Sequence, residues 1–226
     1  MPLNQSYTTI RLVEEATSLA YLILAALGAM ALGLGLFGYL WRHPFVLAYL
    51  ALYAGFDVAD RFARPPFDPV ANKDQTPACR LNAVLMVALF AAAPFERTYI
   101  HGGDPPMLLS AFGVMVQLAG LSLALGARIQ LGRFGTPHLE VLDNHDIIRT
   151  GLYRRIRHPI YTGGIISRQA WAILWGAPVV FILGAIADVL LMSWRIRTEE
   201  AMMAARFGEP YNLYMAETWR LIPGVW

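Results

Sequence analysis

The chain has 226 residues, of which 57% are hydrophobic and 15% charged, a balance typical of an integral membrane protein and not of a soluble domain. Its formal net charge of +2 is too small to indicate nucleic-acid binding. The single cysteine, Cys79, excludes an internal disulfide and any metal cage built from cysteines.

Four apolar runs occupy the first 133 residues. Residues 16–41 form a run that begins only after Arg11, Glu14 and Glu15 and is long enough to cross a bilayer. A secretory signal peptide is therefore not expected, and the run should remain as a helix. Residues 44–56 are short for a full crossing, and the proline-rich stretch 63–79 predicts a loop. Residues 81–93 and 107–131 predict two further membrane helices.

Two charged residues, Glu96 and Arg97, follow the third run. Charged groups inside a membrane are candidates for a functional role. Here they lie near the expected end of the helix, so the sequence predicts a solvated ion pair at the membrane interface.

The stretch 145–164, HDIIRTGLYRRIRHPIYTGG, concentrates charged and aromatic residues between apolar runs. Gly151 can take the backbone through positive φ, and a helix is expected to begin at His158 or Pro159, because proline suits the first helical turn. The free amides at this helix start, with Arg157 beside them, attract carboxylate or phosphate groups. An alternative interpretation is that the arginines are only the basic flank of a membrane helix.

Residues 160–176 and 178–194 predict a helical hairpin. Arg168 and Asp188 lie at similar distances from its turn, roughly 14 to 16 Å at a rise of about 1.5 Å per residue. A lone charge at that depth in a membrane is costly, so these residues are expected to pair across the hairpin or to line a polar cavity. The ion pair is the favoured interpretation.

Basic residues divide unequally between the two ends of the predicted helices. With five or six crossings, one side collects Arg11 and the arginines of 61–80, 128–157 and 195–220, and the other keeps only Arg42 and Arg97. The positive-inside rule then predicts that the stretch 145–164 faces the cytoplasm, where a soluble cofactor can reach it.

Within 145–164, the order Gly-x-Tyr and then Arg-His-Pro-x-Tyr-x-Gly resembles the signature of the isoprenylcysteine carboxyl methyltransferase and phospholipid methyltransferase superfamily. A second block, WRIRTEEAMMAARFGEPYNLYMAETWRLIP at 194–223, resembles another part of that signature. The matching residues are Gly151, Tyr153, Arg157, His158, Pro159, Tyr161 and Gly163 in the first block, and Arg195, Glu199, Glu200, Phe207, Gly208, Tyr211, Tyr214, Arg220 and Pro223 in the second. Residues 1–130 match only as generic membrane helices.

The resemblance implies an all-α, polytopic membrane protein with five or six transmembrane helices, including a C-terminal helical hairpin, and a cofactor site that faces the cytosol. It implies a single membrane domain, residues 1–226. In this domain, residues 1–133 would be the transmembrane scaffold and acceptor-entry region, and residues 134–226 the cofactor-binding core. It also implies S-adenosylmethionine as methyl donor and a membrane lipid or another lipophilic molecule as acceptor.

S-adenosylmethionine needs a partner for its ammonium group, donors for its carboxylate and a slot for its adenine. Glu199 or Glu200 can accept hydrogen bonds from the ammonium group. The amides around Pro159, together with His158, can face the carboxylate. The tyrosines available to pack on adenine or near the sulfonium are Tyr153, Tyr161 and Tyr211.

Carried over residue by residue, the resemblance implies a set of cofactor-binding residues: His138, His145, Asp146, Ile147, Ile148, Tyr153, His158, Pro159, Ile160, Tyr161 and Glu199. Residues 145–148 would meet the adenosyl portion, and Glu199 would be the cofactor-binding acid. Arg195 lies one helical turn before Glu199 on the same face, and it would meet the substrate as the catalytic candidate. His138 and His145 can also be interfacial histidines without a ligand.

Two other functions fit parts of the sequence. Membrane sterol or steroid reductases that use NADPH share a related architecture and an Arg-His-Pro motif, but their motif continues with Asn, Tyr, a variable residue, Gly and Glu. This chain has Ile160 and Gly164 where that Asn and Glu would stand. The other alternative is a membrane protein that kept the fold without chemistry, and the intact signature residues argue against it.

The sequence does not decide whether the methyl acceptor is a carboxylate, a thiol or a phospholipid amine. Arg195 suits an anionic acceptor through charge pairing. Methyl transfer is an in-line displacement, so it needs close positioning of donor and acceptor but no covalent enzyme intermediate.

Overall fold

The structure is a computed structural model that describes residues 43–63, 76–134 and 146–226. Within these ranges the chain is helical and forms no strand, which confirms the predicted all-α class; Ile156 and Trp219 form one isolated parallel bridge. The described α-helices are α3 (Pro44–Ala63), α4 (Thr76–Phe95), α5 (Met107–Leu131), α6 (Pro159–Trp175), α7 (Pro178–Phe207) and α8 (Glu209–Glu217). The short elements are the π-helix η2 (Glu96–His101) and the 3-10 helices η3 (Gly132–Phe134) and η4 (Gly151–Arg154).

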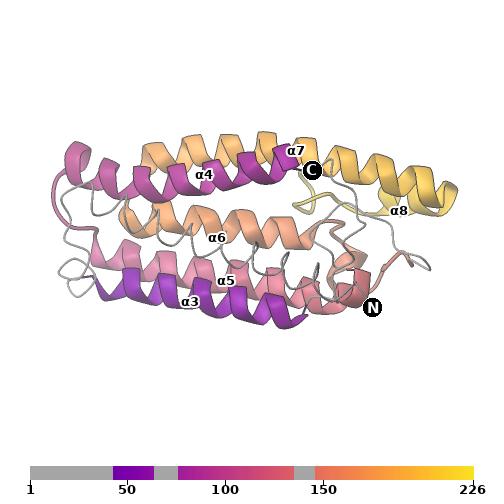
Figure 1. Ribbon diagram of the computed structural model, residues 1–226, viewed down its shortest axis with the longest axis horizontal. Helices are drawn as coiled ribbons and strands as arrows, with labels where there is room; N and C mark the ends of the chain where they lie inside the picture. Colours follow the sequence, from indigo (N-terminus) through magenta and orange to yellow (C-terminus); the bar gives the residue numbers. More distant parts are fainter. Residues whose placement is uncertain (1–42, 64–75, 135–145) are drawn as a thin grey trace, which may run out of the picture.

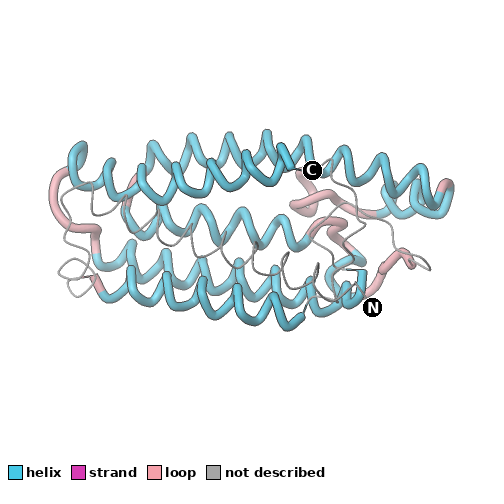
Figure 2. The backbone as a smooth tube through the Cα atoms, viewed as in Figure 1, coloured by secondary structure: helices cyan, strands magenta, loops and turns pink. Residues whose placement is uncertain are grey.

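The long helices lie side by side along the longest axis of the molecule (Figure 1). Helix α6 runs through the middle, with α4 and α7 along one side and α3 and α5 along the other. The turn between α6 and α7 lies at one end of the bundle, whereas η4, α8 and the C-terminus gather at the opposite end (Figure 2). The two sequence blocks therefore meet at the same end of the bundle.

Two of the described helices, α5 and α7, are long and apolar enough to cross a membrane. The predicted helix 107–131 has the expected bounds, and the predicted hairpin forms with Gly176 at its turn in the left-handed conformation, at φ +61°. The predicted first span, residues 16–41, lies outside the described residues. The number of crossings stays a prediction.

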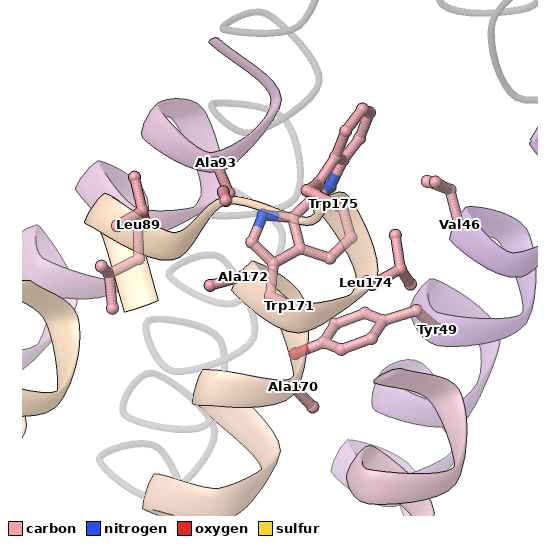
Figure 3. Close-up of a cluster of buried hydrophobic side chains, with 11 residues drawn as sticks. Val46, Tyr49, Leu89, Ala93, Ala170, Trp171, Ala172, Leu174 and Trp175 are labelled. Atoms are coloured by element: carbon pink, nitrogen blue, oxygen red, sulfur yellow. The ribbon is translucent and has the colours of Figure 1, made fainter. Parts of the chain in front are cut away.

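An aromatic cluster joins α3, α4 and α6 in the interior (Figure 3). The Trp171 ring stacks on Phe90 at a centroid distance of 4.6 Å and lies 4.8 Å from the Tyr49 ring. The buried Tyr49 hydroxyl donates to the Ser167 carbonyl at 2.8 Å, so the phenol keeps a hydrogen-bond partner away from water. The cluster fixes the C-terminal half of α6 against its neighbours.

Helices α5 and α6 approach closely at three glycines. A methyl group on Gly163 would lie 2.5 Å from the Gly120 carbonyl oxygen, and one on Gly120 would lie 2.6 Å from the Ser167 amide nitrogen. A methyl group on Gly113 would lie 2.7 Å from the Leu174 amide nitrogen. Small residues stabilise helix pairs in membranes because they let the backbones come together. Gly163 of the first sequence block therefore has a packing role.

Helix α3 continues to Ala63, so the predicted end at residue 56 is wrong. Asp60 is buried near the end of α3 and accepts a hydrogen bond from Arg128 Nε of α5 at 2.8 Å. Because its charge is paired with Arg128, Asp60 can be buried within the helix. Helix α4 begins at Thr76, so residues 76–79 are helical and not part of the predicted loop 63–79.

The predicted solvated pair of Glu96 and Arg97 is also wrong. Glu96 is buried, and its carboxylate accepts hydrogen bonds from the amides of Val179 and Val180 at 3.0 and 2.7 Å. These amides belong to the first turn of α7, where free donors attract an anion. The Arg97 Nε instead donates to the Asp104 carbonyl at 3.0 Å. Glu96 therefore ties η2 to the start of α7.

The predicted ion pair of Arg168 and Asp188 is confirmed. Arg168 Nε lies 2.8 Å from Asp188 Oδ1. The second carboxylate oxygen accepts a hydrogen bond from Gln169 Nε2 at 2.7 Å, and Arg168 Nη1 donates to Asn82 Oδ1 of α4 at 2.8 Å. Both charges are buried, so this polar cluster links α4, α6 and α7 across the apolar interior.

The close approach of α5 and α6 predicts that alanine substitutions at two neighbouring glycines differ in their effect on stability. Gly163→Ala is expected to destabilise the protein by about 1–3 kcal/mol, because overpacking pushes the two backbones apart. Gly164→Ala is the matched control, since no atom lies within 4 Å of a methyl group at that position. Thermal unfolding of the purified protein in detergent measures both, and an equal Tm for the two variants would contradict the close contact.

The buried ion pair predicts that substitutions of its two residues have non-additive effects on the free energy of unfolding. Asp188→Ala is expected to cost about 3–5 kcal/mol, because it leaves the Arg168 guanidinium buried without its counter-charge. Replacing both partners by apolar residues, Arg168→Met with Asp188→Leu, should recover most of that loss. Chemical unfolding of the single and double variants forms the thermodynamic cycle. Additive losses would show that the pair contributes no coupling.

Candidate functional site

The start of the first sequence block is anchored to the end of α5. Gly151 opens η4 at φ +59°, as predicted, and Gln130 of α5 accepts a hydrogen bond from the Leu152 amide at 2.8 Å. Helix α6 begins at Pro159 with His158 as its N-cap, which confirms the predicted helix start. A left-handed glycine and an N-terminal proline thus set the direction of the chain into α6.

Between η4 and α6 the backbone pairs with the C-terminal tail, residues 218–226. The Arg157 amide donates to the Trp219 carbonyl at 2.8 Å, and the His158 amide donates to the Arg220 carbonyl at 3.1 Å. These two amides are therefore occupied by the chain itself. They are not among the free amides expected at the start of α6.

Tyr161 on the first turn of α6 joins the two sequence blocks. Its hydroxyl donates to Glu199 Oε2 of α7 at 2.7 Å. Arg195 Nε donates to the same hydroxyl oxygen at 2.9 Å, and its guanidinium carbon lies 5.4 Å from the centre of the tyrosine ring. Arg195 and Glu199 therefore share one face of α7, as their spacing predicts.

His158 lies beside this junction. Its ring is buried and stacks on Tyr161, with centroids 5.5 Å apart and an interplanar angle of 11°. The Nδ1 atom lies 3.8 Å from Glu199 Oε2, and the Nε2 atom lies 3.4 Å from Glu200 Oε1. The imidazole thus stands between two neighbouring carboxylates.

The adjacent acids have different surroundings, because successive residues of an α-helix point about 100° apart. The Glu199 side chain keeps 29% of its surface exposed, and its contacts with Tyr161 and His158 both fall on Oε2. The Glu200 side chain is 6% exposed. It accepts from Arg157 Nε at 2.8 Å and from Arg220 Nε at 2.9 Å.

The other tyrosines of the two blocks, Tyr153, Tyr211 and Tyr214, are buried. The Tyr153 hydroxyl donates to the Ala127 carbonyl of α5 at 3.3 Å. Tyr214 of α8 donates to the Tyr153 carbonyl at 2.7 Å, and its ring lies edge-to-face with Tyr211 at 5.9 Å. Burial raises the pKa of Tyr214 to about 12, although the guanidinium of Arg157 acts to lower it. Tyr214 therefore stays a neutral hydrogen-bond donor at physiological pH.

The structure describes some of the remaining predicted site residues and not others. His138 and His145 lie outside the described residues. Asp146, Ile147 and Ile148 lead into η4, with the acid exposed and both isoleucines half-buried, and their proposed contact with the adenosyl group stays a prediction. In the first turn of α6, Pro159 is buried and Ile160 is half-buried. The structure therefore brings together His158, Tyr161, Arg195 and Glu199.

The sequence-based prediction missed the tail as part of the site. Arg157 Nη1 donates to the carbonyls of Met215 and Thr218 and to Thr218 Oγ1, so one guanidinium binds both α7 and the end of α8. The Leu221 carbonyl accepts a hydrogen bond from Thr162 Oγ1 at 3.0 Å. Arg220 in the second block was the one sequence feature that indicated a role of the tail in the site. Backbone hydrogen bonds form with any residue type, so the sequence does not reveal them.

Residues 108–210 match the family model of phospholipid methyltransferases. A protein-S-isoprenylcysteine O-methyltransferase from Dictyostelium discoideum is 30% identical over 86 residues, which are 38% of this chain and 36% of that protein. The B form of that enzyme from Arabidopsis thaliana is 26% identical over 121 residues, which are 53% of this chain and 61% of that protein. The chain thus spans less than two thirds of the length of either relative.

A solved structure of a eukaryotic intramembrane Ras methyltransferase, an isoprenylcysteine carboxyl methyltransferase, aligns with a TM-score of 0.49 and 23% identity. The alignment covers 69% of this chain and 55% of that one. The residues that match the family model, 108–210, include the first sequence block and the beginning of the second. The C-terminal half of the chain is thus similar to phospholipid methyltransferases and to isoprenylcysteine O-methyltransferases.

Proposed function

We propose that the protein is an integral membrane methyltransferase that moves a methyl group from S-adenosylmethionine to a lipophilic or small acceptor. The observation that carries this proposal is the contact of Tyr161 with both Arg195 and Glu199, through which the two sequence blocks meet. The curated relatives, named as isoprenylcysteine O-methyltransferases, support it.

The residues at this junction suit the proposed cofactor. The partly exposed Glu199 carboxylate can accept hydrogen bonds from its ammonium group. The stacked rings of His158 and Tyr161 offer a flat aromatic face for the adenine or the sulfonium. The amides of Ile160 and Tyr161, in the first turn of α6, have no partner within the helix and can serve the carboxylate.

Bound S-adenosylmethionine would supply a methyl group on a positively charged sulfur; the acceptor lone pair would form the new bond to carbon while the electrons of the carbon–sulfur bond stay on sulfur. The protein contributes by holding both partners in line and by excluding water. Glu199, His158 and Tyr161 would fix the donor. No residue of the junction needs to become covalently attached to the methyl group.

Arg195 would orient the acceptor. Its half-buried guanidinium lies next to Tyr161 and one helical turn from Glu199, so a negative acceptor group could approach the donor beside it. A carboxylate or thiolate fits this charge, and a phospholipid amine would have to lose a proton first. The acceptor would enter from the bilayer through residues 1–133 of a protein that crosses the membrane five or six times, with residues 134–226 as the cofactor core and the site facing the cytoplasm.

Cofactor binding tests the proposal. Isothermal titration should detect binding of S-adenosylhomocysteine, the demethylated product, and no binding of NADPH. Glu199→Gln should weaken that binding by about 10-fold or more, because it removes one charged partner of the ammonium group. Glu217→Gln, at an exposed acid of α8, is the matched control and should leave the Kd unchanged. Unchanged binding by Glu199→Gln would show that the site assignment is wrong.

Acceptor choice can be tested with two arginines of α7. Arg195→Gln should lower methyl transfer to an anionic acceptor about 10-fold or more, because it removes a charged hydrogen-bond donor. Arg197→Gln, at an exposed position, should leave transfer unchanged. The measurement is transfer of a radiolabelled methyl group to a prenylcysteine analogue, a phospholipid amine and a small thiol. Equal losses in the two variants would remove Arg195 from the acceptor site.

A further inference from the structure

Glu200 is the best-connected acid of the candidate site. Its Oε1 atom accepts from Arg157 Nε at 2.8 Å and lies 3.4 Å from His158 Nε2, and its Oε2 atom accepts from Arg220 Nε at 2.9 Å. These donors come from two segments, the turn before α6 and the C-terminal tail. Glu200 itself belongs to α7, so one carboxylate holds three parts of the chain together.

We propose that Glu200 is a positioning residue, which fixes Arg157, His158 and the C-terminal tail around the cofactor site without touching the cofactor. The inference rests on the proposed methyltransferase function. It assigns different tasks to the two adjacent acids of the second block: Glu199 contacts the ligand, and Glu200 holds the residues that surround the ligand.

Burial and charge argue against a direct contact of Glu200 with the cofactor. Its side chain is 6% exposed, compared with 29% for Glu199, and both of its oxygens already accept from guanidinium groups. An ammonium group has little access to a side chain that is so little exposed, and one that took the place of a guanidinium would break a buried ion pair. Breaking a buried ion pair in this way leaves a charge without its partner, which is strongly unfavourable.

The contacts around Glu200 lead to the ligand-binding residues. Arg157 also binds the Thr218 hydroxyl, and the Arg157 and His158 amides pair with the tail. The His158 ring stacks on Tyr161, which donates to Glu199. Loss of the Glu200 charge would therefore disturb the whole binding surface and not the contact with one ligand group.

Two ligands that differ in a single group separate positioning from direct contact. Isothermal titration and displacement would give the Kd of S-adenosylhomocysteine and of its deamino analogue, which lacks only the ammonium group. Glu199→Gln should weaken binding of the first compound about 10-fold or more and leave the second within about threefold. Glu200→Gln should weaken binding of both by similar factors, about 10-fold or more.

The fitted stoichiometry distinguishes positioning from a purely structural role. Positioning predicts a near-normal number of binding sites with a raised Kd, whereas a structural role predicts fewer sites with an unchanged Kd. If Glu200→Gln does not fold, Glu200→Asp takes its place, and it should weaken both ligands in parallel by a smaller factor because it keeps the charge. Glu217→Gln is again the control.

The outcomes are distinct. A selective loss of S-adenosylhomocysteine binding in the Glu200 variants would identify Glu200 as a direct ligand of the ammonium group and overturn the proposal, as would an unchanged Kd for both compounds. If the unsubstituted protein binds neither compound, the proposed methyltransferase function itself fails.

Discussion

The site depends on the hydrogen bond between the Tyr161 hydroxyl and Glu199, because it joins two stretches that are far apart in the sequence. Tyr161 lies on the first turn of α6, and Glu199 lies in the C-terminal half of α7, beyond the hairpin turn at Gly176. The hairpin brings the helices together at the turn, but it does not by itself fix their alignment at the other end. The buried pair of Arg168 and Asp188 supplies that alignment halfway along.

The first sequence block contains both residues that pack helices together and residues of the candidate site. Gly163 has to be small because a methyl group there would lie 2.5 Å from the Gly120 carbonyl oxygen of α5, and this close approach of the helices sets the position of α6 within the bundle. Two residues earlier, Tyr161 is then held where it can reach both Arg195 and Glu199. A signature of this kind therefore combines residues that contact a ligand with residues that only place the helix.

The sequence predicted the helix 107–131, the hairpin and its ion pair, because each depends on local patterns or on depth along a helix. The all-α class and the clustering of Tyr161 with Glu199 were expected from the resemblance of the two sequence blocks to the methyltransferase signature. The sequence-based prediction failed where a distant partner decides the outcome. Helix α3 continues past Asp60 because Arg128 pairs with the Asp60 carboxylate. Glu96 is buried because the first turn of α7 offers free amides to its carboxylate. The pairing of the tail with Arg157 and His158 was missed for the same reason: backbone hydrogen bonds form with any residue type.

The central claim is that the junction of the two sequence blocks binds S-adenosylmethionine through Glu199 while Glu200 stays with its own partners. An experimental structure with S-adenosylhomocysteine bound would test it most directly. The claim predicts the ligand ammonium within hydrogen-bond distance, about 3 Å, of the Glu199 carboxylate, with Glu200 still bound to Arg157 and Arg220. A ligand bound elsewhere, or an ammonium group on Glu200 with the arginines displaced, would contradict it.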